Sequence, residues 1–118
     1  MKTRAGGVSR RGRRPDNQDA LGLFSQHNVY TVADGMGGLE DGARVSKSAV
    51  TSVRETAASL SRLARQAARS ASAQDRRALF GGVEDLYGRA GGQLYAMAER
   101  EDQRMGTTLT TAILAGTQ

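Results

Sequence analysis

The strongest constraint on the fold is a helical period that begins at Gly42 and runs through about half of the chain. Apolar residues recur every three or four positions as far as Ser70, and a second stripe follows. The stripes consist of Val50, Val53, Ala57, Leu60 and Ala64, and of Leu79, Val83, Leu86, Ala90, Leu94 and Met97. Ser72 and Asp75 resemble a capping box between them. The pattern predicts a long helical hairpin.

Five glycines interrupt the second stripe, and each costs about 1 kcal/mol relative to alanine inside a helix. They are Gly81, Gly82, Gly88, Gly91 and Gly92. The second helix therefore depends on tertiary packing, or it breaks in the middle.

The segments around the helical pattern are typical of strands. Residues 19–25 and 28–34 are predicted strands, and the short polar connection from Gln26 to Asn28 favours a hairpin. Residues 106–115 are rich in Thr and branched side chains and predict a further strand, whereas a strand at residues 2–9 is less favoured because of its glycines. Strands, a helix pair and a final strand predict an α+β fold with helices on one face of an antiparallel sheet.

Composition limits the classes of function. The 118 residues suit one small domain, and the lack of Cys excludes disulfides and thiolate sites. No apolar run is long enough for a membrane span, so we expect a cytoplasmic protein without membrane partners. Much of the net charge of +5 comes from six basic residues among the first fourteen. Such a cluster suits phosphate or nucleic acid, but no aromatic residue lies nearby to stack on bases, so we expect no nucleic-acid partner.

One candidate metal ligand is Asp34, which follows Val32 and Ala33 at the predicted end of a strand. Gly35 next to it exposes a backbone carbonyl. A carboxylate and an adjacent carbonyl form the hard oxygen pair that Mg²⁺ and Mn²⁺ prefer. An ordinary Asp-Gly turn is the alternative interpretation.

A second candidate segment, RRPDNQD, contains Arg14, whose guanidinium fork suits a phosphate dianion. Its predicted turn consists of Pro15, Asp16 and Asn17. Asp19 then begins the next strand, which would bring it close to Asp34. An ordinary basic surface turn is the alternative. The third segment, MGTTLT, is a strand start without a strong catalytic group.

Together these segments resemble a known family. Arg-x-x-Asn-Gln-Asp, Val-Ala-Asp-Gly-Met-Gly-Gly, a helix pair and Met-Gly-Thr-Thr-Leu follow one another in the order found in metal-dependent protein phosphatases. The chain is similar, from about Ser9 to Gly116, to the amino-terminal half of the bacterial form of this PPM family, the type-2C serine/threonine phosphatases. The resemblance implies that residues 1–118 are the amino-terminal part of such a domain. The implied fold is part of a four-layer αββα sandwich.

The resemblance also implies an activity and a set of site residues. Asp34 matches the carboxylate that bridges two Mn²⁺ or Mg²⁺ ions, and the carbonyl of Gly35 matches a ligand of one ion. Arg14 matches the arginine that holds the substrate phosphate, and Asp19 matches an acid that hydrogen-bonds metal-bound water. Metal-activated water would hydrolyse phosphoserine or phosphothreonine in proteins. Gln18 stands where many relatives have Glu.

The chain departs from the family pattern in its proton donor. Many eukaryotic relatives carry His after the Asp-Gly pair, where this chain has Met36, as bacterial members do. Met cannot donate a proton to the leaving group. The single His, His27, lies in the predicted hairpin connection and is interpreted as a surface residue.

The largest departure is length, because the family's catalytic domain is considerably longer and carries later aspartates that complete the metal shell. We therefore expect a truncated gene product, a fragment or half of a split enzyme, inactive as an isolated chain. One alternative is a non-catalytic module that binds a phosphoprotein or a serine/threonine kinase. A basic nucleic-acid binder is another.

Overall fold

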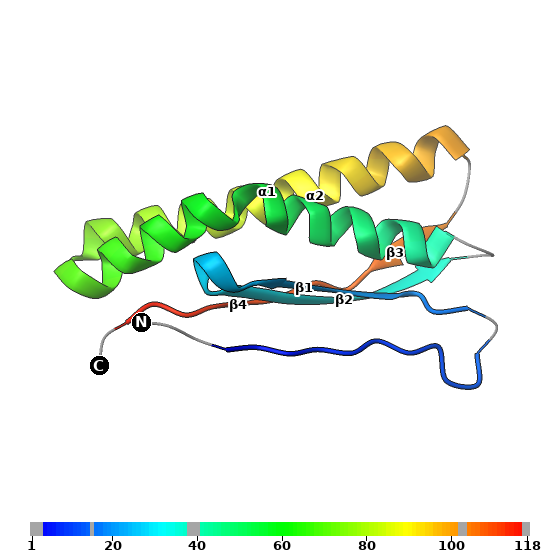
Figure 1. Cartoon of the computed structure of the whole chain (residues 1–118). Coiled ribbons are helices and arrows are strands. Elements are labelled where there is room, and N and C mark those ends of the chain that lie inside the picture. Colours follow the sequence, from blue (N-terminus) through cyan, green and yellow to red (C-terminus); the bar gives the residue numbers. More distant parts are fainter. Residues whose placement is uncertain (1–3, 15, 38–40, 102–103, 117–118) are drawn as a thin grey trace.

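The computed structural model describes residues 4–14, 16–37, 41–101 and 104–116, in which two long helices lie on one face of an antiparallel sheet (Figure 1). The elements are β1 (Asp19–Phe24), the 3-10 turn η1 (Ser25–His27), β2 (Val29–Gly37), α1 (Asp41–Ser70), α2 (Ala73–Glu101), β3 (Met105–Thr107) and β4 (Thr110–Ile113). The predicted α+β class with a helical hairpin is confirmed.

Strand β2 is the central strand of the sheet. It pairs antiparallel with β1 along one side and with β3 and β4 along the other. Gly35 pairs with Thr107 and Val32 with Thr110, so β3 and β4 follow β2 in one unbroken register. The prediction of a single strand over residues 106–115 was wrong, because the ladder is interrupted at Thr108 and Leu109.

The predicted β1–β2 hairpin is confirmed, but its connection and one end differ from the prediction. The connection is a turn of 3-10 helix that ends at Asn28, whose φ of 54° is left-handed. Asn tolerates this conformation better than most residues. At the other end, β2 continues past Asp34 to Gly37, so the prediction that the strand ends at Asp34 was wrong.

The segment before β1 crosses the face of the sheet opposite the helices (Figure 1). Residues 4–10 form no strand, which corrects the prediction for residues 2–9, of which 2 and 3 lie outside the described residues. A Cβ atom on Gly7 would lie 3.4 Å from the Leu23 side chain and 3.5 Å from Leu21. The segment therefore packs on the sheet without pairing with it, since it lacks alternating apolar residues.

Helix α1 buries the whole predicted stripe, from Val50 to Ala64. Helix α2 is continuous despite its glycines. Gly82 has a packing reason, because a Cβ atom there would lie 2.8 Å from the Leu63 side chain of α1. Among the residues of α2, Leu86 is buried, whereas the rest of its predicted stripe is half-buried.

The link between the helices contains half of the predicted capping box. The Asp75 N–H donates to the Ser72 hydroxyl at 3.0 Å, which caps α2. The Ser72 N–H donates to Ser70 rather than to Asp75, so the reciprocal bond is not made. Ala71, with φ 52°, ends α1 in the left-handed conformation, and its N–H donates to the Ala67 carbonyl at 3.0 Å.

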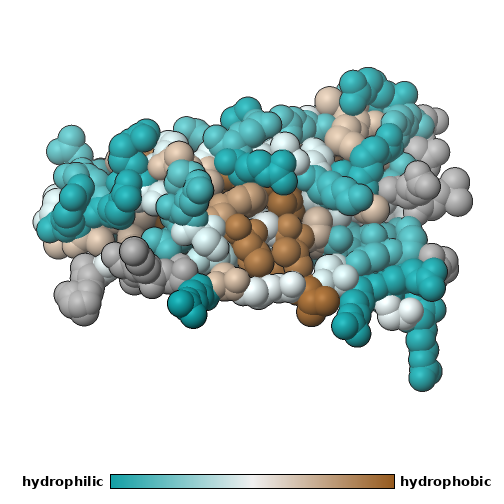
Figure 2. Space-filling view, viewed as in Figure 1, coloured by the Kyte–Doolittle hydropathy of each residue, from teal (hydrophilic) through white to brown (hydrophobic). Residues whose placement is uncertain are grey.

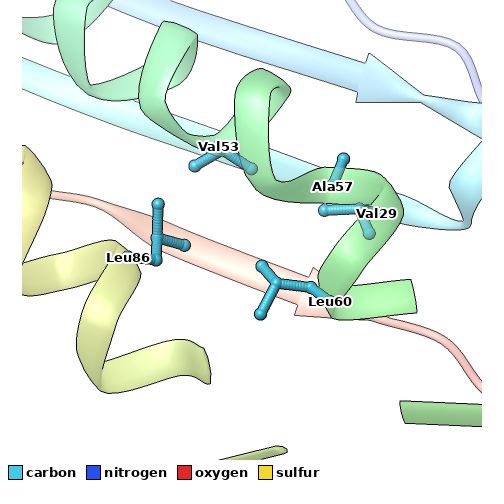
Figure 3. Packing of buried hydrophobic residues seen from close by; sticks show 5 residues of the cluster. All are labelled: Val29, Val53, Ala57, Leu60 and Leu86. Atoms are coloured by element: carbon cyan, nitrogen blue, oxygen red, sulfur yellow. The ribbon is translucent and has the colours of Figure 1, made fainter. Parts of the chain in front are cut away.

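The core lies between the sheet and the helical hairpin (Figure 3). Its buried cluster joins one residue of β2, three of α1 and one of α2, namely Val29, Val53, Ala57, Leu60 and Leu86. Figure 2 shows further apolar residues at the surface between the helices and the sheet, so this side of the core is open. Small side chains let α1 approach the sheet closely.

The molecule is elongated, with extents of 47 × 30 × 16 Å, because a 30-residue helix is about 45 Å long. Its radius of gyration of 15.7 Å exceeds the roughly 13.5 Å of a compact domain of this length. Within the described parts of the chain, neither helix combines the length and the apolar character needed to cross a bilayer.

Candidate metal and phosphate site

Two of the predicted site residues, Asp19 and Asp34, are directly opposite each other in the β1–β2 ladder. Facing residues of antiparallel strands have Cβ atoms about 4.5–5.5 Å apart. Both residues are exposed. Neither carboxylate accepts a hydrogen bond from a described residue or forms an ion pair with one. The prediction that the two acids lie close together is confirmed.

The backbone of Asp34 is held by Thr108, at the interruption between β3 and β4. The Asp34 N–H donates to the Thr108 hydroxyl at 2.9 Å, and the Thr108 N–H donates to the Asp34 carbonyl at 2.9 Å. The Thr108 carbonyl, which a regular ladder would use here, accepts the hydroxyl of Thr107 at 2.8 Å. Two threonine side chains thus replace the regular pairing at the position of the candidate metal ligand.

Gly35 lies inside β2, not in the Asp-Gly turn that was the alternative interpretation. A Cβ atom on Gly35 would lie 1.9 Å from the carbonyl oxygen of Gly42, so the close approach of α1 requires glycine. The Gly35 N–H donates to the Gln18 carbonyl at 2.9 Å. Because both backbone groups of a residue in a strand face the same neighbour, the Gly35 carbonyl also faces this side.

Gln18 has a structural role beside the glycines. Its amide donates to the Gly37 carbonyl at 3.1 Å and to Asp16 at 3.3 Å. A Cβ atom on Gly42 would lie 2.5 Å from the Gln18 side chain, so this residue packs against the start of α1. Gly37 is the last residue of β2, and Gly38 lies outside the described residues.

Arg14 is the last residue of a tight turn, which its N–H closes by donating to the Arg11 carbonyl at 3.4 Å. Gly12, at the first central position of this turn, has φ +66°, the conformation that glycine adopts there in type II′ turns. Pro15, part of the predicted turn, lies outside the described residues. The Arg14 side chain makes no hydrogen bond or ion pair with any described residue.

Asn17 fastens this loop to the sheet. Its amide donates to the Ser9 hydroxyl at 2.8 Å, and its carbonyl oxygen accepts the Asp19 N–H at 3.0 Å. One side chain therefore closes the loop from Ser9 and fixes the first residue of β1. Asn17 thereby positions both the arginine turn and one of the two carboxylates.

A polar pocket of about 230 Å³ joins these features. Arg14, Asp19 and Asp34 all line it, so three of the four predicted site residues share one pocket. The other lining residues are also polar, namely Arg10, Arg11, Asp16, Asn17 and Gln18. The segment that precedes β1 turns at the right-hand end of the sheet in Figure 1, and it carries the lining residues Arg10, Arg11 and Arg14.

The donor set suits a hard divalent cation but is small. Among the described residues, no group of three or more His, Cys, Asp or Glu side chains could hold a metal ion. Mg²⁺ commonly retains several waters and takes one or two carboxylates together with substrate phosphates. The facing Asp19 and Asp34, which form no ion pair with a described residue, and the nearby Gly35 carbonyl fit such a partial site.

A second pocket, of about 540 Å³, shares Asp16 and lies against the start of α1. Arg44 lines it and forms ion pairs with Asp41 and with Glu101, the last residue of α2. The hydrogen bond from Arg44 lowers the pKa of Glu101 below its usual value. These ion pairs join the start of α1 to the end of α2. The Arg44 guanidinium is therefore already paired with two carboxylates.

The two residues considered for proton transfer lie elsewhere. His27 is half-buried in η1, at the end of the hairpin where Phe24 pairs with Val29, opposite to the Asp19–Asp34 end. Met36 is 65% exposed on β2. Neither lines the pocket that contains Asp34.

Several residues of this site were not predicted from the sequence. Thr108 and Asn17 act through hydrogen bonds to backbone groups that only the tertiary structure brings near. Arg10 and Arg11 were recognised as part of a basic cluster, but nothing in their spacing indicated that they line a pocket with the acids. The repeated Thr in MGTTLT was the available signal for Thr108.

Compared with models of known protein families and with curated proteins, the sequence gives no match.

Proposed function

We propose that this chain supplies the amino-terminal part of a metal-dependent phosphoprotein phosphatase of the PPM type. The observation that carries the proposal is the direct pairing of Asp19 with Asp34 in a pocket also lined by Arg14. Two facing carboxylates repel each other in a sheet, and a bound cation would offset this repulsion. An arginine beside them suits a phosphoryl group.

In this proposal Asp34 and the Gly35 carbonyl hold Mn²⁺ or Mg²⁺, and Asp19 accepts a hydrogen bond from water at the metal. When bound, two such ions supply the charge that activates water and offsets the negative charge of the phosphoryl group. Arg14 binds and orients the phosphate of a phosphoserine or phosphothreonine protein. Thr108 and Asn17 hold the two carboxylates in place through the backbone.

The four-layer αββα arrangement is part of the same proposal. It is supported by apolar side chains on the sheet face opposite the helices, where Val32 is 57% exposed and Leu23 is 39% exposed. A second sheet, from this or another polypeptide, would cover them and bring further metal ligands. A cytoplasmic role in bacterial signalling belongs to this proposal as well.

Metal binding tests the proposal most directly. Titration of the purified chain with Mn²⁺, followed by calorimetry, is expected to show binding that Asp34→Asn abolishes and that Asp19→Asn weakens about tenfold. Asp85→Asn, which removes an exposed carboxylate of α2, is the matched control and is expected to bind Mn²⁺ as the unmodified chain does. Equal Mn²⁺ affinity in all four proteins would overturn the metal assignment.

Catalysis requires a separate measurement, because a partial metal shell binds the ions weakly. We expect the isolated chain to hydrolyse p-nitrophenyl phosphate and a phosphothreonine peptide very slowly in Mn²⁺. Robust turnover that depends on Asp34 would contradict the expectation that the isolated chain is inactive, while supporting the phosphatase assignment.

A second candidate function is a non-catalytic module that binds phosphoproteins, including a serine/threonine kinase. The observation that favours it is that the Arg14 side chain lines the pocket and has no partner among the described residues. In this case phosphopeptide binding persists in EDTA and is lost in Arg14→Ala. Binding that disappears with the metal would contradict this candidate.

A further inference from the structure

The pocket contains more arginine than the proposed reaction uses. Arg10, Arg11 and Arg14 all line it, whereas one guanidinium is sufficient to hold a phosphate in two parallel hydrogen bonds. Arg10 is exposed, and its side chain makes no hydrogen bond or ion pair with any described residue. Its guanidinium is therefore not held by any described residue of the fold.

The loop that carries these arginines is held in a defined conformation. The turn closed by the Arg14 N–H and the Arg11 carbonyl follows Arg10, and the hydrogen bond between Asn17 and Ser9 ties both ends of the loop together. Arg10 directly follows Ser9, which this hydrogen bond holds in place. Side chains on such a loop lose less entropy on binding than side chains on a free terminus.

The pocket is also larger than a phosphoryl group. Its volume of about 230 Å³ corresponds to roughly eight water molecules at about 30 Å³ each, whereas a phosphoryl group has four heavy atoms. The described side chains around the remaining space are polar or charged. These side chains favour a polar neighbouring residue of the substrate in this space.

We propose that Arg10 forms a subsite for an acidic residue that adjoins the phosphorylated residue, so that the substrates are acidic phosphopeptides. The inference rests on the proposed function, in which Arg14 holds the phosphate. A guanidinium pairs with a carboxylate in a bidentate geometry, which selects Asp or Glu over neutral residues. Because Asp19 and Asp34 repel an acidic substrate, the preference increases when a cation neutralises them.

The test compares phosphothreonine peptides whose flanking residues are Glu, Gln or Lys, with fluorescence anisotropy as the measurement. In Mn²⁺ we expect the Glu peptide to bind about fivefold more tightly than the Gln peptide, and the Lys peptide to bind weakest. Arg10→Ala is expected to remove the preference for the Glu peptide over the Gln peptide. The affinity for the Gln peptide is expected to change by less than about twofold.

Arg13→Ala is the matched control, because Arg13 lies in the same turn and carries the same charge but does not line the pocket. It is expected to retain the preference for Glu. Equal loss in Arg10→Ala and Arg13→Ala would show a general charge effect and overturn the subsite. An equal loss for all three peptides in Arg10→Ala would place Arg10 on the phosphate instead, which also overturns it.

The same experiment separates this inference from the function on which it rests. Arg14→Ala is expected to weaken all three phosphopeptides alike. If phosphopeptides bind through Arg14 but Glu and Gln peptides bind equally, the acidic subsite is wrong and the proposed function stands. If an unphosphorylated Glu peptide binds as well as the phosphorylated one, the phosphate assignment of Arg14 fails. Absence of all binding contradicts both.

Discussion

Asp19 and Asp34 occupy facing positions on β1 and β2, two like charges in a place where a sheet ordinarily carries complementary side chains. This arrangement lowers stability unless something positive binds. Asp19→Asn is therefore expected to raise the free energy of unfolding in EDTA by about 0.2–1 kcal/mol. Urea unfolding measures this change.

In Mn²⁺ the sign is expected to reverse, because the unmodified chain gains stability from binding that Asp19→Asn weakens. Asp85→Asn serves as the control for loss of one negative charge on an exposed surface. If Asp19→Asn destabilises the chain in EDTA, the two carboxylates do not repel each other and the cation site loses its main support.

Gly35 and Gly88 offer opposite outcomes for one kind of substitution. Gly35→Ala places a methyl group 1.9 Å from the Gly42 carbonyl oxygen and is expected to cost at least about 2 kcal/mol. Gly88→Ala meets nothing within 4 Å on α2 and is expected to stabilise the helix by about 0.5–1 kcal/mol. Thermal unfolding measures the change in stability of both variants. Similar changes for Gly35→Ala and Gly88→Ala would contradict the close approach of α1 to β2.

Thr108→Val tests the side chain that replaces a ladder hydrogen bond. Valine keeps the branched shape but cannot accept the Asp34 N–H, so we expect a loss of about 1 kcal/mol in unfolding free energy and weaker Mn²⁺ binding. Thr108→Ser, which keeps the hydroxyl, is expected to retain most Mn²⁺ affinity. Thr110→Val, on the exposed face of β4, is the control and should stay within about 0.5 kcal/mol.

A substitution in the link between the helices is expected to increase stability. Ala71 has φ 52°, which costs a residue with a Cβ atom about 1–2 kcal/mol. Ala71→Gly is therefore expected to raise the unfolding free energy by about 1 kcal/mol. Ala58→Gly, at an exposed position within α1, is expected to lower it by a similar amount. Chemical denaturation of both variants checks the contrast, and a loss in Ala71→Gly would refute it.

Acid is expected to weaken the helical hairpin. The Ser70 hydroxyl and then the Gln66 amide lower the pKa of Asp75 below 3.8, and Arg44 lowers the pKa of Glu101 below 4.5. A carboxyl group with a lowered pKa stabilises the fold above its unfolded-state pKa, and this contribution is lost as the pH falls through the folded-state value. Stability is therefore expected to fall below about pH 4.5.

Unfolding measured between about pH 6 and pH 3 tests this expectation. Asp75→Asn should be less stable than the unmodified chain at the higher pH, and the difference should narrow as the pH falls. Ser70→Ala, which leaves the carboxyl group but removes its main partner, should behave in the same direction. Stability curves that stay parallel throughout would show that Asp75 contributes nothing in its charged form.

The sequence allowed the helical hairpin, the β1–β2 hairpin and the proximity of Asp19 to Asp34 to be predicted, because each depends on local periodicity or on one short connection. The end of β2 was misjudged because glycine usually disfavours strands, whereas Gly35 is required by a helix that approaches from elsewhere in the chain. The break at Thr108 depends on a choice between a hydroxyl and a carbonyl as acceptor, which no local pattern determines.

The continuous register of β3 and β4 along β2 has a consequence for the order of folding. The hydrogen bonds that hold Asp34 come from Thr108, a residue 74 positions later. During synthesis, β1 and β2 can pair as soon as they emerge, but the backbone of Asp34 lacks its bonds to Thr108 until that later segment has been made and has docked. Contacts over such sequence separations form slowly, because the chain must first close a long loop. Asp34 thus gains its backbone support from Thr108 only after a long loop has closed.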